Sequence, residues 1–373
     1  MTEAVKVEAR RPPPALPLSV LTGFLGAGKT TLLNRLLQDP SLAHTLVIIN
    51  EFGDIGLDHL FVEAIDDNLM LMQSGCLCCS IRGDLVTTLE GVLRDLDNHR
   101  LAQLDRIIIE TTGLADPAPI LQTIMLHPYL MLRLRLEGVI TLVDAVNGLA
   151  TLDAHVEALR QVAVADRLVL TKTDLLPEGP SPALLERLAA LNPAAKPLLL
   201  QAEAALASIL LNAGLYDPAR KHPDVAGWLR ADAYDHDHHH HHDRNRHNAR
   251  IQAFCLTTDT PAAPAAFDMF IELLRQAHGP KLLRVKGIVA LADDPSRPLV
   301  VHGVQHVFHP PVRLAAWPDD DHSTRMVFIL MDLPPSFVEG LWRAFTGAAE
   351  TDRPDGAALS ANPLRPPSGG LFG

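Results

Sequence analysis

The sequence predicts an α/β fold in which a mostly parallel sheet is covered by helices, followed by a smaller α+β domain. Short apolar runs alternate with segments of helical periodicity in the first part of the chain, which is the pattern of repeated βαβ units. The apolar runs lie at 16–22, 45–50, 104–110, 138–144 and 166–171. Apolar strands that alternate with helices imply a parallel sheet covered on both faces. One intervening segment carries apolar residues on a single helical face, at Leu85, Leu89, Val92, Leu93 and Leu96.

A second group of elements follows where this pattern fades, near residue 225. Strands are expected near 250–257, 282–291, 299–308 and 325–332, and helices near 264–277 and 335–345. This mixture predicts a separate α+β domain. The predicted organisation is a flexible leader at 1–15, a first domain at 16–225, a linker at 226–248, a second domain at 249–348 and a disordered tail at 349–373.

Composition and charge narrow the function classes. With 47% hydrophobic residues among 373, the chain can bury a full core. A formal net charge of -12 argues against binding to a phosphate backbone, so no nucleic-acid partner is expected. No apolar run approaches the roughly 20 residues that span a bilayer, and the first residues do not form a signal peptide. We therefore expect a cytoplasmic protein with no membrane partner.

A glycine-rich motif, GFLGAGKT at residues 23–30, lies between the first predicted strand and an amphipathic helix. This motif in this setting is typical of a phosphate-binding loop (P-loop), whose backbone amides converge on nucleotide phosphates. Lys29 is expected to reach the β- and γ-phosphates, and the Thr30 hydroxyl is expected to bind Mg²⁺. A glycine-rich turn without a ligand is the alternative. The expected nucleotide contacts are Gly23, Gly26, Ala27, Gly28, Lys29, Thr30 and Thr31.

A carboxylate at the end of another predicted strand supplies the second group of the nucleotide site. Glu110 ends the run IIIE and is followed by Thr-Thr-Gly113. We expect Glu110 to hold a water molecule of Mg²⁺ and the Gly113 amide to sense the γ-phosphate. Together with Lys29 and Thr30, Glu110 completes the predicted catalytic set for phosphoryl transfer to water. The alternative is a carboxylate that merely ends a strand.

The segment Thr171-Lys172-Thr173-Asp174 follows the predicted strand DRLVL and indicates a guanine site. The Asp174 carboxylate can accept hydrogen bonds from guanine N1–H and the 2-amino group, whereas adenine offers neither donor. The aliphatic stem of Lys172 can lie along the base. Thr171 cannot make the amide contacts of the Asn that GTPases usually have at the first position. GTP is the predicted nucleotide, and a turn with Asp174 as a helix N-cap is the alternative.

Three of the four cysteines, Cys76, Cys78 and Cys79, lie within four residues and directly before a predicted helix. Thiolates bind zinc, copper(I) and cobalt, and a nearby helix N-terminus or a bound metal lowers the thiol pKa. Three sulfur ligands leave one position of a tetrahedral site open, as release of the metal would require. Asp54 and His127 are candidate additional ligands. Buried apolar cysteines or a redox pair are the alternatives.

A histidine-rich segment falls in the predicted linker. Seven of the 18 histidines lie within twelve residues and are interleaved with aspartates. Neutral imidazoles in such a segment offer many exchangeable metal sites, so weak metal buffering is predicted, with a solvated spacer as the alternative. The residues concerned are His236, His238, His239, His240, His241, His242 and His247. His302, His306 and His309 have no consistent face and are expected to be structural.

With these motifs, the sequence resembles the CobW-type P-loop GTPase family, metallochaperones related to the nickel-insertion GTPases of urease and hydrogenase. The matching stretches of the first domain are TGFLGAGKTTLLN, NEFGDIGLD, GCLCCS, IIIETTGLADP, VITLVDA and TKTDLL. In the second domain, LLRVKGIVAL, VHGVQHVF and RMVFILMDLP are similar to the C-terminal domain of the family. Some relatives have an acidic residue directly before NEFG, where this sequence has Ile49, so one potential ligand is absent.

The resemblance implies a GTPase of low intrinsic rate that binds a transition metal and transfers it to a metalloprotein client. By correspondence, Cys76, Cys78 and Cys79 would be the metal ligands, and the loop from Gly23 to Thr31 would hold GTP or GDP with Mg²⁺. Zn²⁺ is the expected metal, with Co²⁺ or Ni²⁺ as alternatives. A cobalt chaperone for cobalamin synthesis and a passive metal buffer or sensor with incidental GTPase activity stay open. A homodimer also stays open.

Overall fold

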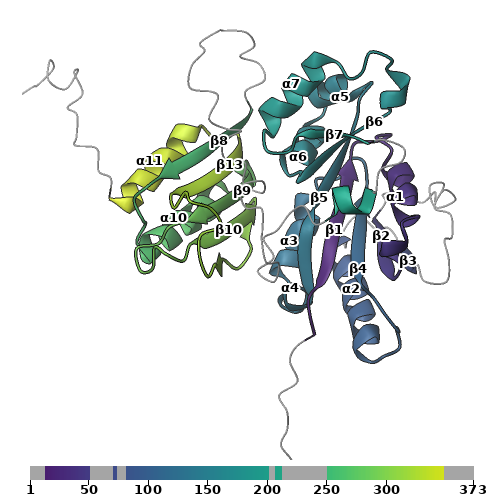
Figure 1. Ribbon diagram of the computed structural model, residues 1–373, viewed down its shortest axis with the longest axis horizontal. Helices are drawn as coiled ribbons and strands as arrows, with labels where there is room; N and C mark the ends of the chain where they lie inside the picture. The colour runs from purple at the N-terminus through teal and green to yellow at the C-terminus, as the bar shows by residue number, and fades with distance from the viewer. Residues whose placement is uncertain (1–12, 51–69, 74–80, 201–205, 212–249, 348–373) are drawn as a thin grey trace, which may run out of the picture.

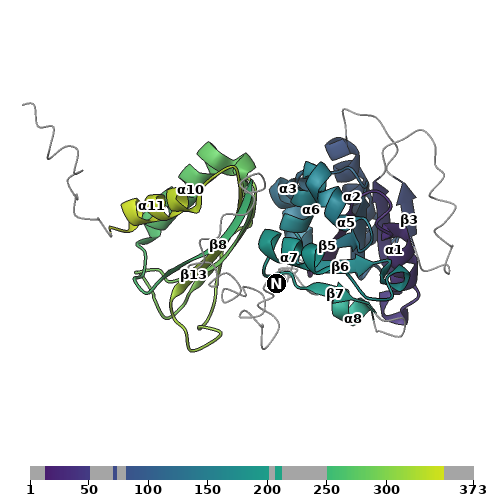
Figure 2. The same ribbon diagram turned by 90° about the horizontal axis from the view of Figure 1, so that it is seen from above.

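The computed structural model describes residues 13–50, 70–73, 81–200, 206–211 and 250–347. Two sheets form the centres of two domains, which lie next to each other in both ribbon views (Figures 1 and 2). The first sheet has seven strands in the order β3-β2-β4-β1-β5-β6-β7, and every pairing is parallel. Its strands are β1 (Leu16–Gly23), β2 (Thr45–Asn50), β3 (Met70–Gln73), β4 (Arg106–Thr111), β5 (Leu134–Asp144), β6 (Arg167–Thr171) and β7 (Pro197–Leu199).

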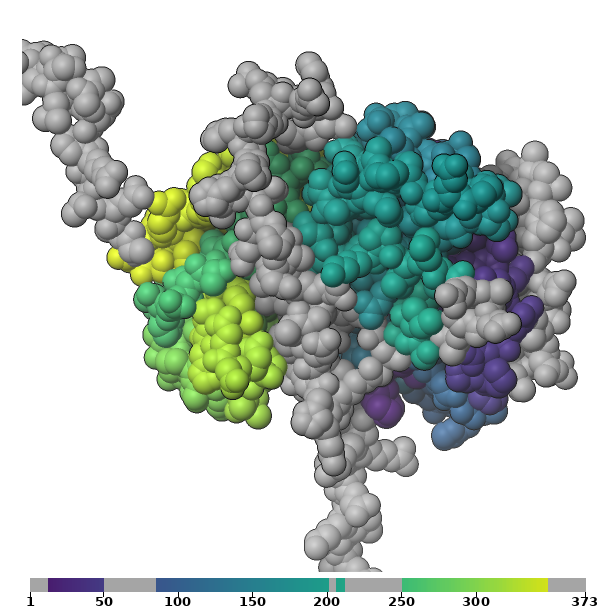
Figure 3. Space-filling view, turned by 45° about the horizontal axis from the view of Figure 1, so that its top comes forward, coloured from purple at the N-terminus to yellow at the C-terminus, as the bar shows by residue number. Residues whose placement is uncertain are grey.

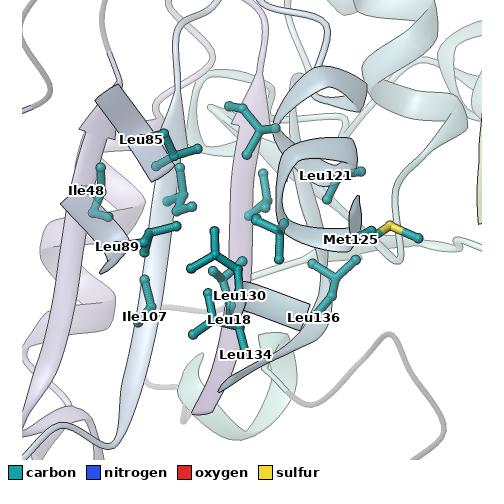
Figure 4. Packing of buried hydrophobic residues seen from close by; sticks show 14 of the residues in the cluster. Leu18, Ile48, Leu85, Leu89, Ile107, Leu121, Met125, Leu130, Leu134 and Leu136 are labelled. Carbon is teal, nitrogen blue, oxygen red and sulfur yellow. The ribbon is translucent and has the colours of Figure 1, made fainter. Parts of the chain in front are cut away.

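Helices cover both faces of this sheet, as predicted. Helices α2, α3 and α4 pack on one face with side chains that include Leu18, Ile48, Leu89 and Leu121 (Figure 4). Helices α1 and α8 pack on the other face, and α5, α6 and α7 pack over β5 and β6. The helices are α1 (Lys29–Leu37), α2 (Ile81–Asp97), α3 (Ala118–Leu126), α4 (Pro128–Arg133), α5 (Gly148–Ala154), α6 (Val156–Ala163), α7 (Pro182–Leu191) and α8 (Leu206–Leu210).

The predicted apolar face after the cysteines is confirmed in α2. Leu85, Leu89, Val92 and Leu93 are buried in the core, and Leu96 packs against it. The five predicted strands of the first domain are also confirmed. Strands β3 and β7 were not predicted because runs of four and three residues are too short to show a period.

The second sheet is antiparallel and has the order β11-β10-β9-β13-β8, with β12 beside β10. Its strands are β8 (Ile251–Thr258), β9 (Leu282–Val289), β10 (Leu299–Val304), β11 (Val307–Phe308), β12 (Val312–Arg313) and β13 (Thr324–Met331). Helices α10 (Pro264–His278) and α11 (Pro335–Thr346) cover the face turned away from the first domain (Figures 1 and 2). Phe270 packs edge-on against both Phe328 and Trp342 and holds these helices on the sheet. These elements confirm the predicted α+β domain.

The opposite face of the second sheet packs on the first domain. Ile329 and Met331 of β13 share an apolar cluster with α6 and α7, and Val304 and Val307 share the cluster of α3. Figure 3 shows the green and yellow surface of the second domain beside the teal surface of the first. The contact is therefore built from buried side chains of both domains.

A buried ion pair joins the domains at the same contact. Asp166, before β6, accepts hydrogen bonds from Arg284 and from Lys286 Nζ at 2.8 Å, both on β9. Arg284 also donates to the Val164 carbonyl. Burial acts to raise the pKa of Asp166, but the charges of Arg284 and Lys286 outweigh it and hold that pKa well below its usual range. Burial lowers the pKa of Lys286 to about 7.

The predicted leader, linker and tail fall mostly outside the described residues, so the predicted domain bounds stay predictions. The described chain leaves the first domain at residue 211 and enters the second at residue 250. Across the described parts of the chain, no helix combines the length and apolar character needed to cross a membrane.

Candidate functional site

The predicted nucleotide residues converge at the carboxyl edge of the first sheet. Strands β1, β4, β5 and β6 are parallel and end at Gly23, Thr111, Asp144 and Thr171. Asp144 and Thr171 lie directly opposite each other in the register of β5 and β6. Ligands of open α/β sheets bind in the crevice outside these strand ends. The four following loops therefore border one site.

The glycines of the P-loop are needed by its backbone. Gly23 has φ 146°, and a Cβ there would lie 2.6 Å from the Leu142 carbonyl oxygen. Gly26 and Gly28 have φ 70° and 86°, the left-handed region that favours glycine. Gly28 is the N-cap of α1 and has no side chain to cap the helix. The first backbone amides of α1 can therefore donate to a phosphate. Thr31 is exposed in the first turn of α1.

Lys29 is folded into the P-loop. Its side chain is buried, and Nζ donates to the carbonyls of Gly23 at 3.1 Å and Phe24 at 3.4 Å. Hydrogen bonds between an ammonium and a phosphate are roughly twice as strong as bonds between neutral groups. A nucleotide phosphate can therefore replace these carbonyls as partners, and the loop already encloses the lysine.

Thr30 and Glu110 meet at the end of β4. Thr30 Oγ1 donates to Glu110 Oε1 at 3.1 Å, and Glu110 is 2% exposed. Thr111 Oγ1 donates to Thr22 Oγ1 at 2.7 Å and joins the ends of β4 and β1. A hydroxyl and a carboxylate in contact are the hard oxygen ligands that Mg²⁺ prefers, so these residues fit that ion. Thr30 can bind Mg²⁺ directly, and Glu110 can hold one of its water molecules.

The loop after β4 packs directly on the P-loop. A Cβ on Gly113 would lie 2.6 Å from the Leu25 nitrogen and 2.7 Å from the Leu25 Cα, so no other residue fits here. Gln161 of α6 is 1% exposed and donates through Nε2 to the carbonyls of Gly113 at 3.1 Å and Ala115 at 3.0 Å. Sequence reasoning missed Gln161, because no motif marks a glutamine of an amphipathic helix.

Thr171 links the predicted base loop to the P-loop. Its Oγ1 donates to the Ala27 carbonyl at 2.8 Å, and a Cβ on Gly28 would touch its side chain at 3.9 Å. The Thr171 hydroxyl thus holds the two loops together, although threonine lacks the amide group of the Asn that GTPases usually have at this position. Asp174 is exposed in a short 3-10 turn directly beyond, open to a base.

Lys172 is held by a carboxylate that the sequence analysis did not select. Lys172 has φ 57°, and its Nζ donates to Asp144 Oδ2 at 2.7 Å. Burial disfavours the charged form of Asp144, but hydrogen bonds from Lys172 and Asn147 outweigh it and hold the pKa of that carboxyl below its usual value. Asp144 ends the strand VITLVD, so its place at the carboxyl edge was the available signal.

The predicted zinc ligands are not among the described residues. Those outside are Cys76, Cys78, Cys79, Asp54 and the histidines of 236–247. Within the described ranges, no group of three His, Cys, Asp or Glu side chains is placed to hold a metal ion. The described elements on either side of the cysteines are β3, which ends at Gln73, and α2, which begins at Ile81.

His127 lies away from the carboxyl edge. It separates α3 from α4, and α3 has nine residues, which span about 13 Å. The helix leads to the end of the sheet where β1 and β5 begin (Figure 1). His127 Nδ1 accepts from the Leu130 amide at 3.4 Å, and Nε2 lies 3.6 Å from Glu90 Oε1. Because the three cysteines lie outside the described residues, the role of His127 as an additional metal ligand stays a prediction.

His302 and His309 share a face, contrary to the prediction. Their rings stack with centroids 5.8 Å apart, because the β10–β11 turn brings the two positions together and the His309 amide donates to the His302 carbonyl at 2.9 Å. Burial lowers the pKa of His309 to about 4, and burial with the nearby charge of Arg284 lowers the pKa of His302 well below its usual value. His306 is exposed in the intervening turn.

The parallel sheet, the P-loop and the base loop define a nucleotide-binding protein of the P-loop GTPase class. Residues 17–198 match the CobW/HypB/UreG nucleotide-binding domain, and residues 251–346 match the cobalamin synthesis protein cobW C-terminal domain. The chain therefore belongs to the CobW/HypB/UreG family.

Several known proteins are similar to this chain. The zinc chaperone YjiA of Escherichia coli (strain K12) is 33% identical over 332 residues, which cover 89% of this chain and 98% of YjiA. The zinc-regulated GTPase metalloprotein activator 1 of Schizosaccharomyces pombe is 34% identical over 168 residues, 43% of this chain and 40% of that protein. The crystal structure of Zn(II)-bound YjiA GTPase from E. coli matches with a TM-score of 0.64 and 28% identity, covering 89% of this chain and 99% of that one.

Proposed function

We propose that this chain is a GTP-dependent zinc chaperone. In this proposal Cys76, Cys78 and Cys79 bind Zn²⁺ as thiolates, and the ion passes to a metalloprotein client in a step coupled to GTP hydrolysis. Relatives named zinc chaperone and zinc-regulated GTPase metalloprotein activator support zinc as the cargo and a metalloprotein as the client. Membership of a GTPase family supports the hydrolysis.

The position of the cysteine motif in the chain carries the proposed coupling. Strands β3, β2 and β4 are parallel, and in their register Ile49 lies opposite both Gln73 and Glu110. Neighbouring strands are about 4.8 Å apart, so the backbones of Gln73 and Glu110 are roughly 10 Å apart. The chain leaves β3 at Gln73, only three residues before Cys76. This spacing supports a zinc site beside the nucleotide site.

The residues at the carboxyl edge can perform the hydrolysis through position and charge. The γ-phosphoryl group passes to water without a covalent intermediate, and Mg²⁺, when bound, offsets the phosphate charge. Lys29 stabilises charge on the β- and γ-phosphates, and the Gly113 amide donates to the γ-phosphate. Loss of the γ-phosphate removes this contact, so in the GDP state the Gly113 loop is no longer held by the nucleotide in this way. If zinc affinity differs between GTP and GDP, linkage requires zinc to change nucleotide affinity by the same factor.

A competition titration tests this proposal. Zinc affinity is measured against a chelator with a non-hydrolysable GTP analogue and Mg²⁺, and again with GDP. We expect the GTP state to bind zinc about 5- to 150-fold more tightly, the range of typical couplings. Equal affinity in both states would favour a passive metal buffer. A larger nucleotide effect on Co²⁺ than on Zn²⁺ would favour a cobalt chaperone.

Cysteine variants identify the ligands in the same titration. A Cys78→Ser/Cys79→Ser variant replaces thiolates with hydroxyls that stay protonated, so tight zinc binding and its nucleotide dependence should vanish together. GTP binding should survive, because the P-loop is a separate element. Cys255→Ser is the matched control, since Cys255 lies on β8 in the second domain and should leave zinc binding unchanged.

A further inference from the structure

A glutamine of the second domain reaches the loop that follows β4. Gln305, in the turn between β10 and β11, donates through Nε2 to Asp116 Oδ2 at 3.4 Å. Its Oε1 accepts from Gln122 Nε2 of α3 at 2.8 Å. Asp116 stands three residues after Gly113, the predicted γ-phosphate contact. One side chain of the second domain therefore touches the nucleotide loop.

The turn that carries Gln305 is held firmly. Gln305 has φ 55°, and its amide donates to the Leu282 carbonyl at 2.6 Å. The valines on either side, Val304 and Val307, are 2% and 0% exposed and pack in the core cluster of α3. Gln122 is 3% exposed. The direction of the Gln305 side-chain amide is thus fixed by contacts with both domains.

The loop itself behaves as a short closed unit between two anchors. The Ala115 amide donates to the Thr112 carbonyl at 3.2 Å, so residues 112–115 form one turn. Gln161 fixes this turn through the carbonyls of Gly113 and Ala115. Beyond the turn, Asp116 Oδ1 accepts from the Ala118 amide at 2.9 Å. Gly113 and Asp116 are therefore joined by one hydrogen-bonded turn.

The Asp116 carboxylate accepts hydrogen bonds from two different elements. Its Oδ2 accepts from Arg160 of α6 at 3.2 Å as well as from Gln305. Arg160 belongs to the first domain, and its side chain is about one third exposed. Among the hydrogen bonds described for this carboxylate, the one from Gln305 comes from the second domain. The state of the second domain can therefore change how firmly the loop is held.

We infer that Gln305 is a positioning residue for GTP hydrolysis: through Asp116 it holds the Gly113 loop against the P-loop, and it makes turnover depend on the docked second domain. The inference rests on the proposed contact between the Gly113 amide and the γ-phosphate. Gln305 itself does not touch the nucleotide. Because the contact is mutual, exchange of GTP for GDP at Gly113 should also alter the turn that carries Gln305.

Steady-state kinetics of the full chain measure the positioning effect. In Gln305→Ala, kcat for GTP should fall about 5-fold, the change expected from one lost hydrogen bond. KM should change by less than about 2-fold, since the P-loop and base loop hold the nucleotide. In Gln305→Glu the new carboxylate faces Asp116, so kcat should fall further than in Gln305→Ala although the side chain keeps its shape. The double variant Asp116→Asn/Gln305→Glu exchanges donor and acceptor in this bond but loses the bond from Arg160 to Asp116 Oδ2, so it should recover only part of kcat.

A matched control is available in the same turn. His306 is exposed, and its Cβ packs against Gly279 of its own domain. His306→Ala keeps that Cβ and should leave kcat and KM unchanged. Circular dichroism and thermal unfolding of each variant establish that it is folded. Should Gln305→Ala fail to fold, Gln305→Glu with its Asp116→Asn partner provides the same test.

Hydrogen exchange gives a readout that a merely structural glutamine would not affect. In the wild-type chain, exchange in the β10–β11 turn should differ between a GTP analogue and GDP, and in Gln305→Ala this difference should disappear. Unchanged kcat in Gln305→Ala and Gln305→Glu, or nucleotide-independent exchange in the wild-type chain, would overturn the inference. A wild-type chain with no GTP turnover would instead overturn the proposed function.

Discussion

Gly113 lies so close to Leu25 that the P-loop and the loop after β4 leave no room for a side chain between them. A Cβ at position 113 would approach the Leu25 nitrogen to 2.6 Å and the Leu25 Cα to 2.7 Å. Both neighbours are backbone atoms, which cannot move aside as the end of a flexible side chain can. The contact makes one methyl group sufficient to separate the two loops.

We expect Gly113→Ala to slow GTP hydrolysis on the order of 100-fold, because displacement of a positioning loop by about 1 Å can have such an effect. GDP affinity should change little, since the P-loop and base loop bind the diphosphate. Single-turnover hydrolysis and GDP binding measure the two quantities. Gly91→Ala in α2 is the matched control, because a Cβ there meets nothing within 4 Å. Unchanged hydrolysis in Gly113→Ala would exclude the proposed γ-phosphate contact.

Lys29→Ala should weaken GTP binding by about 10- to 100-fold, the loss of one or two hydrogen bonds from a charged group. The remaining fold should persist, because Lys29 lies in the first turn of α1 and alanine is a strong helix former. Isothermal titration with GTP gives the affinity, and circular dichroism checks the fold. Lys196→Ala, at an exposed lysine of the same domain, should bind GTP normally. A folded Lys29→Ala variant with normal GTP turnover would contradict the P-loop assignment.

Asp174→Asn should reduce GTP affinity on the order of 100-fold, because the carboxylate that accepts from guanine N1–H and the 2-amino group is lost. Asparagine can instead donate to the 2-oxo group of xanthine, so affinity for xanthosine triphosphate should rise. Competition between the two nucleotides in wild-type and variant chains measures both changes. A parallel loss for both nucleotides would mean that Asp174 serves the loop structure and not base selection.

Asp166→Asn should lower the free energy of unfolding by about 3–5 kcal/mol at pH 7, because it leaves Arg284 and Lys286 buried without their carboxylate. Asp332→Asn is the control: it breaks an exposed pair with Arg250 and should leave stability nearly unchanged. Urea unfolding of each variant measures the difference. Equal effects of the two substitutions would argue against a domain contact that depends on Asp166.

The pH dependence of the same comparison has a defined sign. The pKa of Asp166 is held below its ordinary value of 3.8 in the folded chain, so its contribution is complete above that value. As pH falls below 3.8, the unfolded chain takes up a proton that the folded chain does not, and the contribution is lost. The difference between wild type and Asp166→Asn should therefore be constant from about pH 5 to pH 6 and shrink in acid. A difference that grows in acid would reverse this assignment.

Local patterns predicted the parts of this protein that depend on neighbours in sequence. The P-loop, the strands around Glu110 and Asp174, and the elements of the second domain each have a period or a motif of their own. The helical face of α2 was likewise visible in the spacing of Leu85 and Leu89. Such features were predicted because the backbone requires particular residue types within a few positions.

Contacts between distant segments were not predicted. Gln305 and Asp116 are 189 residues apart, and neither belongs to a motif that names the other. Arg284 and Asp166 meet only because β9 docks beside α6. The position of His127 depends on the direction of α3, which the residues around His127 do not indicate. These relationships come from the docking of complete elements.

Helices α10 and α11 cover one face of the second sheet, and the first domain covers the other. During synthesis, residues 13–211 leave the ribosome before β9, β10 and β13 exist. Until residue 305 is made, the nascent first domain has its P-loop but lacks Gln305, and before β9 is made it also lacks the partners of Asp166. A chain terminated before residue 251 would therefore present an uncovered apolar surface around α3 to chaperones and proteases. Completion of the polypeptide would then both cover this surface and bring Gln305 to Asp116.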